Sequence, residues 1–170
     1  MSRNQLIKAV ENAISGFQEQ LSLIDTSQLN TVPYEGSWTA GQLAQHMRMA
    51  NSGFVEVING PVKDTERAAD AQIEGIRETF LNFGLKMDAP DFVVPEMREY
   101  KKDSLVNGLE KVKQDVVKAI EELDLDKTCI AFELPVYGYL TRLEAITFII
   151  YHTQRHARQL SRIREKLQVR

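Results

Sequence analysis

The chain has 170 residues, enough for one domain with its own hydrophobic core and too few to indicate two. Hydrophobic residues make up 43% and charged residues 26%, a composition typical of a globular protein and not of a disordered one. The net charge of −3 and the lack of a long basic run exclude charge-driven nucleic-acid binding. Residues 1–8 lack the apolar core of a signal peptide, and the most apolar stretch, 145–151, is far too short to span a bilayer. We therefore expect a single cytoplasmic domain over 1–170 that binds neither nucleic acid nor membrane.

The first predicted helix covers residues 3–23. Ser2 followed by Gln5 is a capping box, in which each side chain hydrogen-bonds the other residue's backbone N–H. Apolar residues then recur at intervals of three and four, as one face of a helix requires. A second helix is predicted over 39–58, again from a capping box, and the sequence Asn-Gly-Pro ends it.

The middle of the chain is less regular. Residues 65–82 favour a short helix, whereas the two prolines within 89–95 exclude one there and indicate an extended loop lying over the other helices. A third long helix is predicted over 97–123. Residues 130–140 resemble a turn-rich connection with a short extended piece.

The last predicted helix covers 141–167 and begins at a third capping box, formed by Thr141 and Glu144. The four long amphipathic helices have no internal repeat and each needs a partner for its apolar face. The expected fold is all-α, a four-helix bundle with long loops and a short extra helix.

The only three histidines lie on the apolar faces of two predicted helices. His152 and His156 are four residues apart, so their Cβ atoms are expected about 5–6 Å apart on one face. His46 lies on the second helix, and one divalent ion would satisfy all three buried imidazoles. By pattern alone, three hydrogen-bonded core histidines in a plain helical interaction domain explain the residues equally well.

The residues around these histidines resemble the DinB/YfiT-like superfamily. The matching segments are Ser37-Trp38-Thr39 followed by Leu43 and His46, and His152-x-x-Arg155-His156-x-x-Gln159-Leu160. The resemblance implies an up-down-down-up four-helix bundle with a divalent metal held by His46, His152 and His156. It also implies a homodimer. Some members are thiol-dependent transferases or isomerases, and others are described as metal-dependent hydrolases.

Three neutral imidazoles leave an open coordination position, which suits catalysis, and zinc or nickel is the expected ion. A thiol-dependent S-transferase acting on a small molecule with a low-molecular-weight thiol is the first expectation, because no general base is evident. The first alternative is a hydrolase that uses a metal-bound hydroxide. The second is a non-catalytic stress-related protein whose metal site serves stability.

Five further residues are candidates for the surroundings of the ion. Gln159, three after His156, is placed to orient a ligand ring. Arg155 pairs either with an anionic substrate or with a surface carboxylate, and Asn51 faces either the pocket or the helix surface. Tyr137 and Tyr139 lie in a loop expected near the open side of the site.

The remaining polar candidates have simpler explanations. Glu56, Glu133 and Glu144 are possible general bases by position, yet solvation or helix capping explains each. Trp38 stands where a hydrophobic staple would pack against its helix. Cys129 is the only cysteine, which excludes an internal disulfide, and we expect it to be a buried, unreactive thiol.

Overall fold

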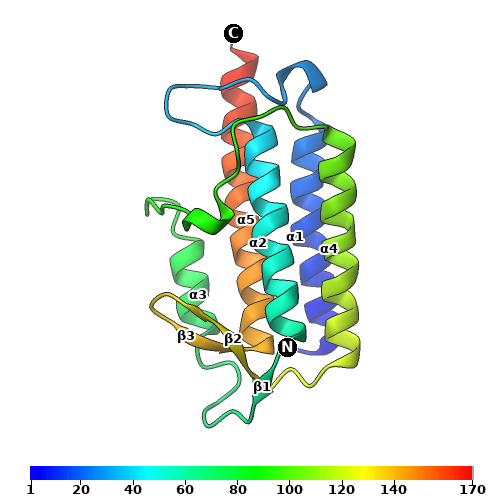
Figure 1. Ribbon diagram of the computed structural model, residues 1–170, viewed down its shortest axis with the longest axis vertical. Coiled ribbons are helices and arrows are strands. Elements are labelled where there is room, and N and C mark those ends of the chain that lie inside the picture. Colours follow the sequence, from blue (N-terminus) through cyan, green and yellow to red (C-terminus); the bar gives the residue numbers. More distant parts are fainter. Residues whose placement is uncertain (170) are drawn as a thin grey trace.

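The structure is a computed structural model that describes residues 1–169 (Figure 1). Its α-helices are α1 (Arg3–Ser22), α2 (Ala40–Asn59), α3 (Ile73–Phe80), α4 (Lys102–Glu122) and α5 (Arg142–Gln168). Two short 3₁₀ helices are η1 (Thr26–Gln28) and η2 (Asp91–Val93). The expected four long helices form the bundle, and α3 is the expected short extra helix. None of the helices within 1–169 is long and apolar enough to cross a bilayer.

All three predicted capping boxes are present. In each, the hydroxyl of Ser2, Thr39 or Thr141 accepts the backbone N–H three residues on, and the Gln or Glu side chain at that position accepts the cap's own N–H. These local hydrogen bonds satisfy backbone donors that a helix N-terminus leaves free. They therefore fix where α1, α2 and α5 begin.

Hydrogen bonds between helix ends define how the bundle is arranged. Arg3, at the start of α1, donates to the carbonyl of Leu123 just past α4 (2.8 Å), and Lys102, at the start of α4, donates to the carbonyl of Ile24 just past α1. These two helices are therefore antiparallel. Arg142, at the start of α5, donates to a carbonyl near the end of α2 (2.8 Å), so that pair is antiparallel as well. In Figure 1, α1 and α5 run upward, whereas α2 and α4 run downward.

The core lies where the four long helices meet. α1 packs against α4 and α5, and α2 packs against the same two helices. Fully buried aliphatic and aromatic side chains from all four fill the centre, among them Phe17, Leu43, Leu109, Ile120 and Ile149. At roughly 1.5–3 kcal/mol for each large apolar side chain removed from water, this burial is the main source of stability.

The prediction of an all-α protein was wrong in one region. β1 (Val62–Lys63), β2 (Thr128–Leu134) and β3 (Gly138–Thr141) form an antiparallel sheet in the order β1-β2-β3. The extended piece anticipated within 130–140 is thus part of a hairpin, with Val136 in its turn and Gly138 at the start of β3 both at positive φ. Its partner β1 is 65 residues or more away in the chain, and local periodicity does not reveal such a pairing.

Two predicted helix boundaries also differ from the structure. The third long helix begins at Lys102 and not at residue 97, since residues 94–101 continue as irregular backbone after η2. The short helix occupies only Ile73–Phe80 of the predicted 65–82. Residues 65–72 instead wrap around the buried Glu144 carboxylate, which accepts two hydrogen bonds from Arg67 and one from the backbone N–H of Gln72.

Candidate metal centre

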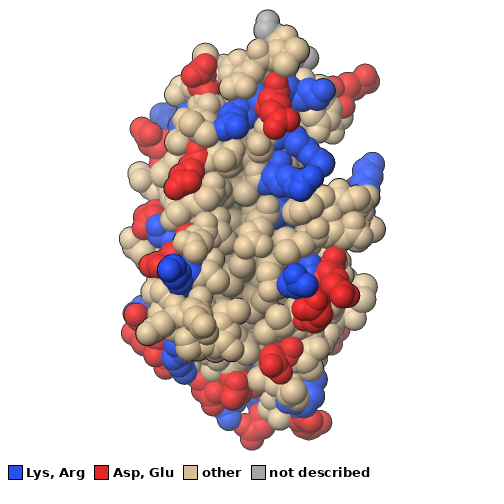
Figure 2. Space-filling view, turned by 180° about the vertical axis from the view of Figure 1, so that it is seen from behind, with Lys and Arg blue, Asp and Glu red and all other residues tan. Residues whose placement is uncertain are grey.

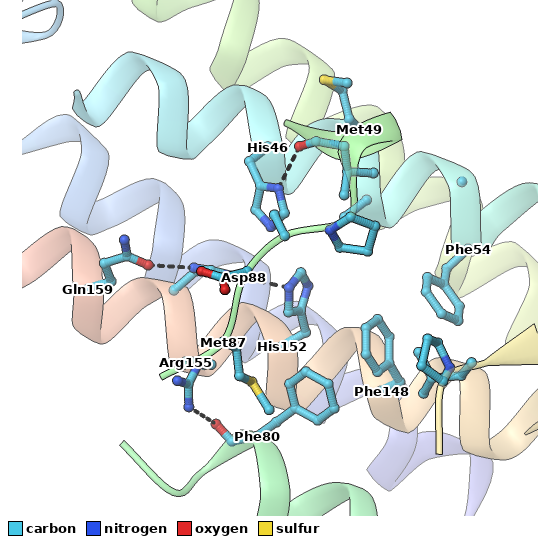
Figure 3. Close-up of a pocket in the computed structure, with 18 of the residues that line it drawn as sticks. His46, Met49, Phe54, Phe80, Met87, Asp88, Phe148, His152, Arg155 and Gln159 are labelled. Carbon is cyan, nitrogen blue, oxygen red and sulfur yellow. Dashed lines mark hydrogen bonds between the residues drawn. The ribbon is translucent and has the colours of Figure 1, made fainter. Parts of the chain in front are cut away.

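His46 on α2 faces His152 and His156 on α5. One ring nitrogen from each histidine lies within 4.8 Å of the other two. The ring centroid of His46 is 5.4 Å from that of His152 and 4.9 Å from that of His156. Figure 3 shows His46 and His152 approaching each other from opposite helices. The three predicted ligand residues thus come together in one cluster.

His46 is oriented by the backbone of η2. Its Nδ1 lies 2.8 Å from the carbonyl oxygen of Val93. Because a carbonyl only accepts, Nδ1 carries the proton and Nε2 keeps its lone pair. The loop expected to lie over the bundle therefore fixes the tautomer of His46, which sequence reasoning did not anticipate.

His156 is oriented by its own helix. Its Nδ1 donates to Oε1 of Gln159 at 2.8 Å, one turn further along α5. The lone pair of the partly buried ring is thereby left on Nε2. The predicted orienting role of Gln159 is present in the structure, and such partners are the usual second layer of metal sites.

His152 lies between His156 and two phenylalanine rings. Its Nε2 lies 3.0 Å from Nε2 of His156, while its buried Nδ1 has no hydrogen-bond partner among the described residues. The ring stacks on Phe148, with centroids 5.0 Å apart, and meets Phe80 edge-on. Packing between two aromatic rings therefore holds it in place.

Burial keeps the cluster uncharged. Burial lowers the pKa of His46, and the hydrogen bond to Val93 offsets part of that effect. Burial also lowers the pKa of His152 well below its usual value and that of His156 to about 3, with further lowering from the neighbouring imidazoles. Neutral imidazoles are the form that binds metals.

The cluster fits a divalent ion. Tetrahedral ligands at about 2.0–2.1 Å from zinc have nitrogens about 3.3 Å apart, close to the 3.0 Å between the two Nε2 atoms on α5. Without a cation, the unprotonated Nε2 of His156 can accept a hydrogen bond only from the Nε2 of His152. An ion between the rings would take up the lone pairs of all three.

The histidines line a cavity of about 1160 Å³ between α2, α3, α5, the hairpin and residues 83–93. Figure 3 shows the two ends of this cavity: Phe54, Phe80 and Phe148 lie on one side of the histidines, and Arg155 and Gln159 on the other. This volume is slightly above that of typical ligand pockets and leaves room for a substrate beside the ion.

Two of the predicted pocket residues have structural roles. Arg155 lines the cavity, but its guanidinium donates to the carbonyls of Phe80, Asn82 and Leu85. It therefore ties the loop after α3 to α5, and it forms no ion pair with a carboxylate among the described residues. Asn51 is fully buried and not on the helix surface, and it donates to Thr153 Oγ1 at 3.2 Å without lining the cavity.

The two tyrosines differ from each other. Tyr137 lines the cavity, and its hydroxyl donates to the carbonyl of Gly75 (2.8 Å) beside Thr79 Oγ1. Tyr139 is not among the lining residues. It lies on β3 opposite Glu133, and the hydrogen bond to that carboxylate raises the pKa of its phenol.

Of the carboxylates considered from sequence, Glu56 alone lines the cavity. Glu144 is fully buried as the cap of α5 and the partner of Arg67. Asp88, which sequence reasoning did not single out, also lines the cavity, and Figure 3 shows its segment crossing the view at the histidines. Nothing in the irregular 83–93 sequence identifies it, because its position depends on the loop's path.

Trp38 lies at the histidine cluster, whereas Cys129 lies away from it. The Trp38 ring lies 5.0 Å from that of His46 and lines the cavity, so it belongs to the site as well as to the packing. In the sequence, the only indication of this role was that Trp38 belongs to the family-like segment that precedes His46. Cys129 is fully buried on β2, away from the cavity, and burial raises its pKa to about 11. The expectation of an unreactive thiol agrees with these surroundings.

The family model of the DinB superfamily matches residues 9–160, a span that includes all three histidines. The chain belongs to the DinB superfamily. A curated relative is the uncharacterized protein YuaE of Bacillus subtilis (strain 168), which is 24% identical over 153 residues, 88% of this chain and 91% of YuaE.

Two solved structures share the fold. TT2238, a four-helix bundle protein, has a TM-score of 0.60 and 16% identity, with 95% of this chain and 99% of that chain covered. YfiT from Bacillus subtilis has a TM-score of 0.62 and 12% identity, with 99% and 90% covered. YfiT is described as a probable metal-dependent hydrolase with an unusual four-helix bundle topology. At these identities the likeness establishes the bundle and not the reaction.

Proposed function

We propose that this chain is a metal-dependent enzyme that binds a divalent ion through His46, His152 and His156 and activates a thiol for transfer to a small electrophile. One observation carries the proposal: three neutral imidazoles, two with Nδ1 already hydrogen-bonded, converge beside a large cavity. A structural zinc site would be closed by a fourth protein ligand. Among the described residues no fourth His, Cys, Asp or Glu joins this cluster.

When bound, the ion would lower the pKa of a thiol that coordinates it, so that the thiolate would form at neutral pH. In the proposed transfer a bond between sulfur and the electrophilic carbon would form as the bond to the leaving group breaks, the leaving group would take the electron pair, and the proton of the thiol would pass to solvent. The chain's own residues hold the reactants. Trp38 and Phe80 flank the histidines, while Phe148 and Phe54, stacked with centroids 4.3 Å apart, offer an apolar surface to the electrophile.

Cobalt substitution tests this proposal. Cobalt(II) in a three-imidazole site absorbs in the visible range, and a coordinated thiolate changes that spectrum. We expect a saturable change when small thiols are titrated into the cobalt protein, and none in His152→Ala. A spectrum indifferent to every thiol would contradict the thiol-transfer proposal while leaving the metal site in place.

Hydrolysis is the second candidate, and Asp88 and Glu56 favour it because a carboxylate in the cavity provides a general base. YfiT's description as a probable metal-dependent hydrolase also points this way. The discriminating variant is Asp88→Asn assayed with ester substrates. A large loss of hydrolysis in this variant, with thiol binding unchanged, would support the hydrolase.

The identity of the ion and the assembly belong to the same proposal. We propose zinc or nickel, because imidazole ligands suit late divalent transition metals. A homodimer in solution is also proposed, and sedimentation of the metal-loaded protein tests it. A monomer would remove the dimer from the proposal without affecting the site.

A further inference from the structure

The cavity at the candidate metal centre has an aromatic wall at one end and a cationic lining at the other. Towards the hairpin it is walled by aromatic rings, namely Phe54, Phe80, Phe132 and Phe148. Towards the C-terminal end of α5 it is lined by the cationic residues Lys86, Arg155, Arg158 and Arg162. Only two acidic residues, Glu56 and Asp88, line the same cavity, although the whole chain has a net charge of −3. Positive charge is therefore concentrated at this site against the overall balance.

Helix geometry places the arginines on one side. Arg155, Arg158 and Arg162 are spaced three and four apart, so they follow one stripe of α5 next to the histidines. With a rise of about 1.5 Å per residue, Arg158 and Arg162 lie about 6 and 12 Å along the axis from the level midway between His152 and His156. In Figure 2, Lys and Arg atoms gather beside a hollow in the upper part of the face shown.

Two of these arginines are free of carboxylate partners. Arg155 is occupied by loop carbonyls. Arg158 and Arg162 form no ion pair with any residue in 1–169, and the guanidinium of Arg158 lies over the Phe83 ring, 4.3 Å from its centroid. Lys86 likewise has no carboxylate within ion-pair distance in that part of the chain. The cationic end is thus available to a ligand.

We propose that this end of the cavity binds the carboxylate or phosphate of a small organic anion whose other end reaches the three histidines. The anionic group sits between Arg158 and Arg162, with Lys86 across the cavity mouth, and the apolar body of the ligand lies against the aromatic wall. Arginine presents paired N–H donors that match carboxylate and phosphate oxygens. The inference rests on the proposed function, because it names the class of substrate for that same site.

A matched pair of thiols tests it. The probes are 6-mercaptohexanoate and 6-mercaptohexan-1-ol, which differ only in the charge at the end remote from sulfur. Each is titrated into the cobalt-loaded protein by calorimetry, which reports binding, while the visible spectrum reports coordination of sulfur. The variants are Arg158→Gln with Arg162→Gln, and the matched control is Lys166→Gln, an exposed α5 cation outside the cavity.

We expect the carboxylate to bind at least about fivefold more tightly than the alcohol, a preference typical of partly exposed charge-assisted contacts. This preference for the carboxylate should vanish in the double arginine variant and persist in Lys166→Gln. Added salt should weaken it. Equal affinities for the two thiols would overturn the inference, and a changed spectrum would then still support the proposed function. A preference without spectral change would support the anion site and count against thiol coordination. Binding of neither thiol would contradict both.

Discussion

The Nδ1 of His156 donates to the Oε1 of Gln159 at 2.8 Å, one helical turn along α5. This bond decides which nitrogen of the ring faces His46 and His152. Removing such a partner from a metal site typically costs 10–100-fold in metal affinity. We therefore expect Gln159→Leu to weaken zinc binding by that range while leaving the fold intact, as competition with a chromophoric chelator would show. Gln159→Glu keeps an acceptor at this position and should retain affinity, so equal losses in both variants would contradict the orienting role.

Arg155 joins α5 to the loop after α3 through three carbonyls. Arg155→Met keeps the aliphatic stem but leaves those carbonyls without their charged donor. We expect a loss of about 1–2 kcal/mol in the free energy of unfolding and faster amide hydrogen exchange in residues 81–88. Arg162→Met, which breaks no hydrogen bond, is the control. Unchanged exchange in Arg155→Met would show that the loop is held by other contacts.

The low pKa of His156, about 3, determines how the metal-free protein responds to acid. Between about pH 6.5 and pH 3 the unfolded chain binds a proton at this histidine and the folded chain does not. The stability contribution is therefore present above pH 6.5 and falls as the pH is lowered, by at most about 1.4 kcal/mol per pH unit. Urea titrations of metal-free protein at several pH values should show a shallower fall in His156→Gln than in the unchanged protein. Parallel curves would contradict the burial of a neutral ring.

Cys129 is fully buried, and its raised pKa of about 11 leaves almost no thiolate at neutral pH. We expect the folded protein to react slowly with a chromogenic disulfide and to release one equivalent only when unfolded. Cys129→Ala should retain any thiol-transfer activity. Loss of activity with unchanged metal content in that variant would place a protein nucleophile in the mechanism.

The predictable parts of the fold are those that depend on interactions between residues close together in the sequence. The capping boxes of Thr39 with Gln42 and of Thr141 with Glu144 specify helix starts through hydrogen bonds between residues three apart. The four-residue spacing of His152 and His156 places both rings on one face, and the apolar stripe of α2 places His46 inward.

What could not be predicted depends on contacts between distant residues. Val62 pairs with Cys129 across the sheet, and no local pattern specifies a pairing between residues so far apart in the chain. The partner of His46 is a backbone carbonyl, at Val93, which any residue type would supply equally well. Asp88 and Arg158 reach the cavity only because the loop after α3 returns over α5.

The proposed function depends on His46, His152 and His156 binding one divalent ion together. The most direct measurement is elemental mass spectrometry of untagged protein, beside alanine variants of each histidine whose helical content is checked by circular dichroism. About one equivalent of zinc or nickel per chain, lost in each folded variant, is the expected result. No metal in the native protein and no uptake on titration with zinc or nickel would contradict the claim and reduce the cluster to three buried, hydrogen-bonded core residues.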